Sequence, residues 1–174
     1  MDDLNRRLLD PSTRRAAFEE TVRTYSPRLY RHIRSMVLSH NDADDVMQET
    51  FLKAWTALDG FKGEAKVSTW LYRIATNESL SFLARQRSSI ALDDTDVERT
   101  LHSDPYFDGD ELQLQLQQAI AQLPDKQRLV FNMKYYEQMK YEDMSEILNT
   151  SVGALKASYH IAVKKIESFF KERD

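Results

Sequence analysis

Only four glycines and four prolines occur in the 174-residue chain, and this scarcity limits what it can fold into. A β-sandwich or β-barrel reverses direction about every ten residues and needs many more turn-forming residues. Hydrophobic side chains make up 41% of the sequence, which is enough to build a core. We therefore expect an all-α protein, with one ordinary domain or two small ones.

The composition also excludes several kinds of protein. The chain has no cysteine, which excludes a disulfide scaffold, a thiolate metal site and a cysteine nucleophile. It has no apolar run near the roughly 18 residues that span a bilayer, and no signal peptide. These features predict a soluble, cytoplasmic protein.

Charge is distributed unevenly along the chain. The net charge of −4 argues against a nucleic-acid binder, which usually carries a basic excess. However, residues 61–91 carry +3 and residues 152–173 also carry +3, whereas residues 92–123 carry −7. Two modestly basic zones separated by an acidic stretch indicate two functional parts.

The acidic stretch has the composition of a linker. Over residues 88–110 the apolar residues lose helical spacing, and one proline and one glycine interrupt the segment. We predict two small helical domains, at 1–87 and 111–174, joined by this acidic, flexible connector. A solvated loop within a single domain is the alternative interpretation.

Apolar residues at helical spacing predict three or four helices in the first domain. Capping side chains and prolines suited to a first turn mark where these helices would begin. The expected starts are Pro11-Ser12-Thr13, Ser26-Pro27, Asp42, and Ser68 or Thr69. The third helix would end near Leu58 and the fourth near Arg87.

The helix expected after Asp42 carries a compact polar patch. Its members are Asp44, Asp45, Gln48 and Glu49. Carboxylates in a first turn offset the helix dipole, which accounts for the two aspartates but less well for Gln48 and Glu49. No histidine or third ligand stands at a suitable spacing for a metal. A protein-docking surface is the other interpretation.

Basic and aromatic residues alternate between Phe61 and Arg87. Cationic side chains that follow a backbone, together with rings that stack on unpaired bases, suit single-stranded nucleic acid. The alternative is that Trp70 and Phe82 are core residues and the charges only solvate the surface.

The second domain contains the pattern of a helix-turn-helix. An apolar helix over residues 141–148 is followed by the polar turn Asn149-Thr150-Ser151 and then by a long helix that becomes basic. Apolar residues from Val152 to Ile166 should form one buried face. Side chains of the opposite face would then point outward, where a recognition helix contacts the major groove. These are Lys156, Ala157, His160 and Lys164. A plain helical hairpin remains the alternative.

Three segments resemble bacterial sigma factors. Residues 42–51 (DADDVMQETF) closely resemble the helix that binds core RNA polymerase, and residues 69–77 (TWLYRIATN) resemble the promoter-melting helix. Residues 123–128 and 151–156 resemble the C-terminal helix-turn-helix domain. The order of the motifs, which cover about 18–169, is similar to that of the short extracytoplasmic-function (ECF) class.

The resemblance implies specific roles for residues of this chain. The residues that would dock on core polymerase are Asp44, Asp45, Gln48, Glu49 and Leu52. Those that would hold a flipped base and the neighbouring non-template strand of the −10 element are Phe61, Lys62, Lys66, Ser68, Thr69, Arg73 and Asn77. Those that would contact the −35 element are Lys156, Ala157, His160 and Lys164.

The resemblance also implies partners and a lack of chemistry. The partners are core RNA polymerase, promoter DNA and an anti-sigma factor, with no cofactor, metal or small-molecule substrate and no catalytic residue. Ser81, Ala84, His160 and Ile161 depart from the residues usual in the family, which bears on promoter sequence. The rival interpretations are a stand-alone helix-turn-helix repressor or activator, which would leave the acidic patch without a role, and a helical adaptor.

Overall fold

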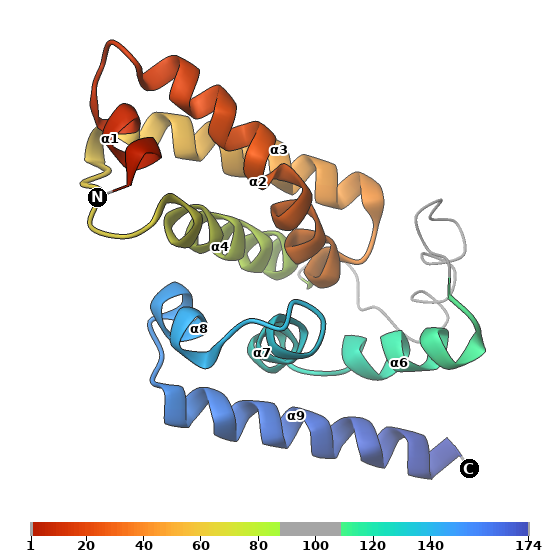
Figure 1. Cartoon of the computed structure of the whole chain (residues 1–174). Helices are drawn as coiled ribbons and strands as arrows, with labels where there is room; N and C mark the ends of the chain where they lie inside the picture. The colour runs from red at the N-terminus through yellow and green to blue at the C-terminus, as the bar shows by residue number, and fades with distance from the viewer. Residues whose placement is uncertain (1, 88–108, 174) are drawn as a thin grey trace.

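The computed structural model describes residues 2–87 and 109–173, which form eight α-helices and one short 3-10 helix (Figure 1). The N-terminal group contains α1 (Asp3–Leu9), α2 (Arg14–Val37), α3 (His40–Ala57), the 3-10 helix η1 (Leu58–Gly60) and α4 (Val67–Arg87). The C-terminal group contains α6 (Glu111–Ala121), α7 (Asp125–Tyr135), α8 (Tyr141–Leu148) and α9 (Val152–Arg173). The all-α prediction is confirmed. The linker expected at 88–110 lies, apart from Gly109 and Asp110, outside the described residues.

Helix α2 is continuous, so the prediction of a new helix at Ser26-Pro27 is wrong. The Ser26 hydroxyl does not cap a helix but donates a hydrogen bond back to the carbonyl of Val22. Pro27 lacks an N–H and removes one helical hydrogen bond. Leu29 and Ile33, both fully buried, continue the apolar stripe of the helix beyond the proline and hold it in the core.

Helix α3 begins earlier than predicted. The Ser39 hydroxyl accepts a hydrogen bond from the backbone N–H of Asp42 at 3.2 Å, so Ser39 and not Asp42 is the N-cap. Asp42 instead occupies the first turn, where its charge offsets the helix dipole. The buried side of α3 consists of Ala43, Val46, Thr50 and Ala54, spaced by three or four residues.

The two groups of helices pack against each other. In the N-terminal group, α2, α3 and α4 contact one another, and in the C-terminal group α9 packs on α6, α7 and α8. Figure 1 shows the first group above the second, with α2 next to α7 and α4 next to α8. One apolar cluster therefore joins Ile33 and Leu71 of the upper group to Met133 and Met144 of the lower one. Among the described helices, none is long and apolar enough to cross a membrane.

Candidate functional site

The polar patch of α3 forms an exposed face. Asp45, Gln48, Glu49 and Leu52 follow at helical spacing, and all four are exposed, Leu52 to 61%. Within the described part of the chain, Asp45 and Glu49 form no ion pair. Asp44 has a partner, since its Oδ2 lies 3.2 Å from Nε2 of His40. This face therefore carries two carboxylates without an ion-pair partner beside an exposed leucine, and an offset of the helix dipole does not account for that combination.

The loop before α4 packs on α1, a helix that the sequence analysis did not predict. Asn5 of α1 is almost fully buried, and its side-chain amide donates to the carbonyl of Ala65 at 3.0 Å and weakly to that of Gly63 at 3.5 Å. Gly63 has φ 73°, a conformation that favours glycine. These contacts fix the loop that carries Lys62 and Lys66, whose side chains are exposed.

The aromatic residues of this region lie largely inside the protein. Phe61 is 6% exposed and its ring lies 4.8 Å from that of Trp70, centroid to centroid. Thr69, also expected at the nucleic-acid surface, is 9% exposed. The side chain of Phe61 thus supports the loop, and the basic side chains around it form the surface.

The outer face of α4 carries the remaining residues that the sequence predicted to contact the −10 element. Arg73 and Asn77 are exposed and stand one helical turn apart, with Ser68 half-buried near the start of the helix. The Arg73 guanidinium donates two hydrogen bonds, of 2.9 and 2.7 Å, to the carbonyl of Glu146 in α8. The helix is anchored from behind by Glu78, a buried carboxylate paired with Lys53 of α3.

Helices α8 and α9 form the predicted helix-turn-helix. Asn149 ends α8 in the left-handed conformation, with φ 50° and ψ 47°. The Ser151 hydroxyl accepts from the N–H of Ala154 at 3.1 Å and so caps α9. Leu155 and Ala162 are buried as expected. The four predicted recognition residues, Lys156, Ala157, His160 and Lys164, are all exposed.

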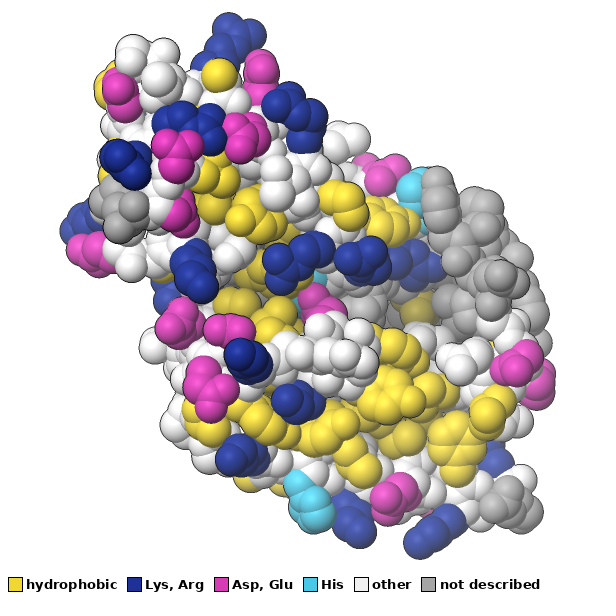
Figure 2. Space-filling model, in the orientation of Figure 1, with side chains coloured by type: hydrophobic (Ala, Val, Ile, Leu, Met, Phe, Trp, Pro, Cys, Tyr) yellow, Lys and Arg dark blue, Asp and Glu magenta, His cyan; other side chains and the backbone are white. Residues whose placement is uncertain are grey.

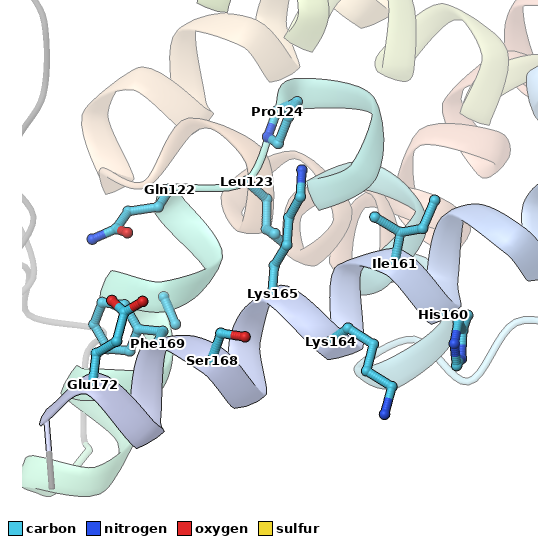
Figure 3. Close-up of a pocket in the computed structure, with 11 residues that line it drawn as sticks. Gln122, Leu123, Pro124, His160, Ile161, Lys164, Lys165, Ser168, Phe169 and Glu172 are labelled. Atoms are coloured by element: carbon cyan, nitrogen blue, oxygen red, sulfur yellow. The ribbon is translucent and has the colours of Figure 1, made fainter.

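A cavity of about 580 Å³ separates the second half of α9 from the connection between α6 and α7 (Figure 3). Figure 3 shows Lys165 extending toward Pro124 in this connection and Ile161 pointing to the same side of α9, while Lys164 points to the opposite side. The Lys165 ammonium donates to the Gln127 side chain at 2.9 Å. Lys165 therefore links α9 to α7, whereas the Nζ of Lys164 lies 3.6 Å from Oε2 of Glu167 on the same helix.

The candidate surfaces are polar and charged. Among the residues that the structure describes, no group of three or more histidine, aspartate or glutamate side chains could hold a metal ion. What the surfaces offer is an acidic face on α3, basic loops and helices near α4, and a separate recognition helix. Such surfaces bind macromolecules.

Comparison with known proteins gives the class. Residues 21–89 match the family described as Sigma-70 region 2, and residues 113–166 match Sigma-70, region 4. The chain is 34% identical over 157 residues to the ECF RNA polymerase sigma factor SigW of Bacillus subtilis, covering 83% of each chain. It is 31% identical over 168 residues to the RNA polymerase sigma-H factor of Pseudomonas aeruginosa, covering 87% of this chain and 84% of that one.

Two solved structures share the fold. CnrH in complex with the cytosolic domain of CnrY has a TM-score of 0.70 at 23% identity and covers 98% of this chain and 97% of that chain. The sigma factor RpoE in complex with the anti-sigma factor NepR from Bartonella quintana has a TM-score of 0.65 at 21% identity, covering 88% and 96%.

The chain belongs to the ECF subfamily of sigma-70 RNA polymerase sigma factors. It is a non-catalytic subunit that directs RNA polymerase to promoters and to initiation, and core polymerase and promoter DNA are its partners. Sequence reasoning missed α1 with Asn5, and it missed the contact between the buried His32 and the half-buried Glu137. Asp2 was a usable signal for α1, because it stands directly before the helix and accepts from the N–H of Asn5 at 2.8 Å.

Proposed function

We propose that the exposed face of α3 docks this sigma factor on core RNA polymerase. The contacting residues would be Asp44, Asp45, Gln48, Glu49 and Leu52. The observation that carries this assignment is the combination of unpaired carboxylates with a 61% exposed leucine on one helical face. A complementary surface would be basic with an apolar recess, because Leu52 gains from burial and the carboxylates need cationic partners.

The −10 element would bind to the loop before α4 and to the outer face of that helix. Lys62, Lys66 and Arg73 would contact phosphates of the non-template strand, and Ser68 and Asn77 would hydrogen-bond to the strand. Phe61 and Thr69 are buried, so we assign them to shaping the loop in which a flipped base would be held.

The −35 element would bind to α9 through Lys156, Ala157, His160 and Lys164. All four are exposed on the helix that follows the Ser151 cap, and the start of that helix is where a helix-turn-helix contacts base edges. We assign the −10 and polymerase surfaces to a domain at 1–87, the −35 surface to a domain at 111–174, and the linker to 88–110.

The docking assignment is tested with the double variant Asp45→Ala and Gln48→Ala. Fluorescently labelled protein is titrated with purified core enzyme in moderate salt without DNA. The matched control, Glu111→Ala and Gln113→Ala, removes a carboxylate and an amide from exposed positions of α6. We expect about a tenfold or greater loss of affinity in the α3 variant and none in the control. Equal affinities in both variants would remove the docking role.

We also propose an anti-sigma partner and a cytoplasmic location. The relative RpoE was solved with the anti-sigma factor NepR, and it shares the fold of this chain. The surfaces listed above would be the ones that such a partner has to cover. A stand-alone repressor, the rival function, would leave the acidic face of α3 without a ligand.

A further inference from the structure

A buried polar cluster joins the two groups of helices. His32 of α2 is fully buried, and its Nδ1 lies 2.8 Å from Oε2 of Glu137, in the turn after α7. The other ring nitrogen, Nε2, lies 2.9 Å from the hydroxyl of Thr76 in α4. The Tyr72 hydroxyl donates to Oε1 of Glu137 at 3.3 Å. We call these four residues the interdomain latch.

The polar groups of the latch have all of these hydrogen-bond partners only in the closed arrangement, because Glu137 belongs to the other group of helices. A neutral imidazole can donate from Nδ1 to the carboxylate while Nε2 accepts from Thr76, so one ring bridges both groups of helices. Burial and the nearby charge of Glu137 raise the pKa of Tyr72 to about 12, which keeps its hydroxyl a donor. Asn132 of α7 adds a hydrogen bond to the carbonyl of Ser35 in α2 at 3.1 Å.

The closed arrangement covers part of the proposed −10 surface. Helix α8 packs on α4, and Arg73 has two of its donors engaged by the carbonyl of Glu146. These two of the five guanidinium donors are therefore not available to a phosphate. Figure 2 shows lysine and arginine side chains gathered along the boundary between the two halves. A cavity of about 830 Å³ at this boundary is lined by Arg28, Arg31 and Lys140.

Promoter geometry also requires the two halves to separate. Positions −10 and −35 differ by roughly 25 base pairs, which at about 3.4 Å per base pair is about 85 Å along B-DNA. A compact chain of this length has a radius of gyration of only about 16 Å. A closed molecule therefore cannot occupy both elements at once.

We propose that the interdomain latch holds the free sigma factor in an autoinhibited, closed form, and that its opening releases Arg73 of α4 from the carbonyl of Glu146 so that it can contact promoter DNA. This inference rests on the proposed −10 role of α4. Since Glu137 is the acceptor for both His32 and Tyr72, its removal leaves two buried polar groups without their partner. Removal of a buried hydrogen-bond partner should therefore shift the equilibrium between the closed and open forms roughly five- to hundredfold toward the open form.

The test measures opening in the full-length chain without polymerase. Because the protein has no cysteine, Thr56→Cys on α3 and Lys171→Cys on α9 allow a donor and an acceptor dye to be attached at exposed positions. Single-molecule energy transfer then gives the ratio of open to closed molecules. We expect Glu137→Ala to raise this ratio at least tenfold and Tyr72→Phe to raise it a few-fold. Glu142→Ala, which removes an exposed carboxylate from α8, should leave it unchanged.

A second readout separates the latch from the proposed function. The association rate of a labelled −10 single strand should rise in proportion to the open fraction. A wild-type chain that is mostly open, or a ratio unchanged in both variants, would overturn the latch. Tyr72→Phe retains the packed ring, so the ratio of open to closed molecules can still be measured in this variant if Glu137→Ala fails to fold. If the variants open but the strand binds no faster, the latch stands and the −10 role of α4 is refuted.

Discussion

Replacement of Asn5 tests whether α1 sets the loop before α4. The Asn5 amide makes one good hydrogen bond, to the carbonyl of Ala65 at 3.0 Å, and one long contact, to Gly63 at 3.5 Å. Loss of the amide donor leaves the part-buried carbonyl of Ala65 without this hydrogen bond, at a cost of about 1–3 kcal/mol. Asn5→Ala also removes Oδ1, which is buried without a partner, and this offsets part of the cost. We expect a net destabilisation of about 1–2 kcal/mol.

Asn5→Asp should be the more damaging substitution. A carboxylate cannot donate, and it would lie against the two carbonyl oxygens in a buried position. We expect a loss of about 3 kcal/mol or more at neutral pH, because a buried charge without a partner is strongly unfavourable. The pKa of the new carboxyl would be raised in the folded state, so the stability lost at neutral pH should be partly recovered below the ordinary aspartate pKa, where the protonated group can donate.

Urea denaturation and thermal unfolding measure both effects. In a chain of this size, about 1 kcal/mol corresponds to a change in Tm of roughly 2–4 °C. Asn41→Ala, at an exposed position of α3, is the control and should stay within about 0.5 kcal/mol of wild type. If Asn5→Ala and Asn5→Asp are equally stable at pH 7, the amide is not acting as a donor and the argument is refuted.

Three further predictions concern single side chains. Lys156→Ala should cost about 1–3 kcal/mol at one promoter position if the lysine contacts a base, or act uniformly if it contacts phosphate; a promoter panel with no loss would exclude both roles. Asn77→Ala should impair strand opening, measured by permanganate footprinting, more than it impairs closed-complex formation. A larger effect on closed-complex formation than on strand opening would contradict the assignment. Tyr72 should contribute stability that is complete below pH 10 and lost as the pH rises toward 12, since its pKa is raised in the folded state. Denaturation at alkaline pH should therefore show a shallower loss in Tyr72→Phe.

The helix-turn-helix and the exposed polar face of α3 were predictable because both follow from local rules. The Ser151 cap, the turn at Asn149 and the apolar spacing of α9 are properties of consecutive residues. The exposed residues of α9 then follow from helical geometry alone. The same rules located α3 and α4 within a few residues of their ends.

Errors arose where tertiary contacts decide the local structure. Ser26-Pro27 carries a sound local start signal, but the buried Leu29 and Ile33 keep α2 continuous through it. Phe61 looked like an exposed aromatic because its burial depends on Trp70, nine residues away. The pair of His32 and Glu137 is separated by 105 residues, and no pattern in one sequence joins such positions.

The small net charge of the chain is consistent with weak binding to DNA in the absence of polymerase. Each proposed promoter surface offers only two or three cations: Lys62, Lys66 and Arg73 for the −10 element, and Lys156 and Lys164 for the −35 element. With two phosphate contacts, the binding constant falls only as about the 1.8 power of the salt concentration. Strong non-specific binding needs about six to ten such contacts. Neither surface can therefore hold DNA well alone, and the closed form engages Arg73 internally. Binding becomes strong when the polymerase fixes both surfaces at once, because the second contact is then intramolecular. The docking that we propose for the acidic face of α3 would make that attachment without adding any attraction for DNA.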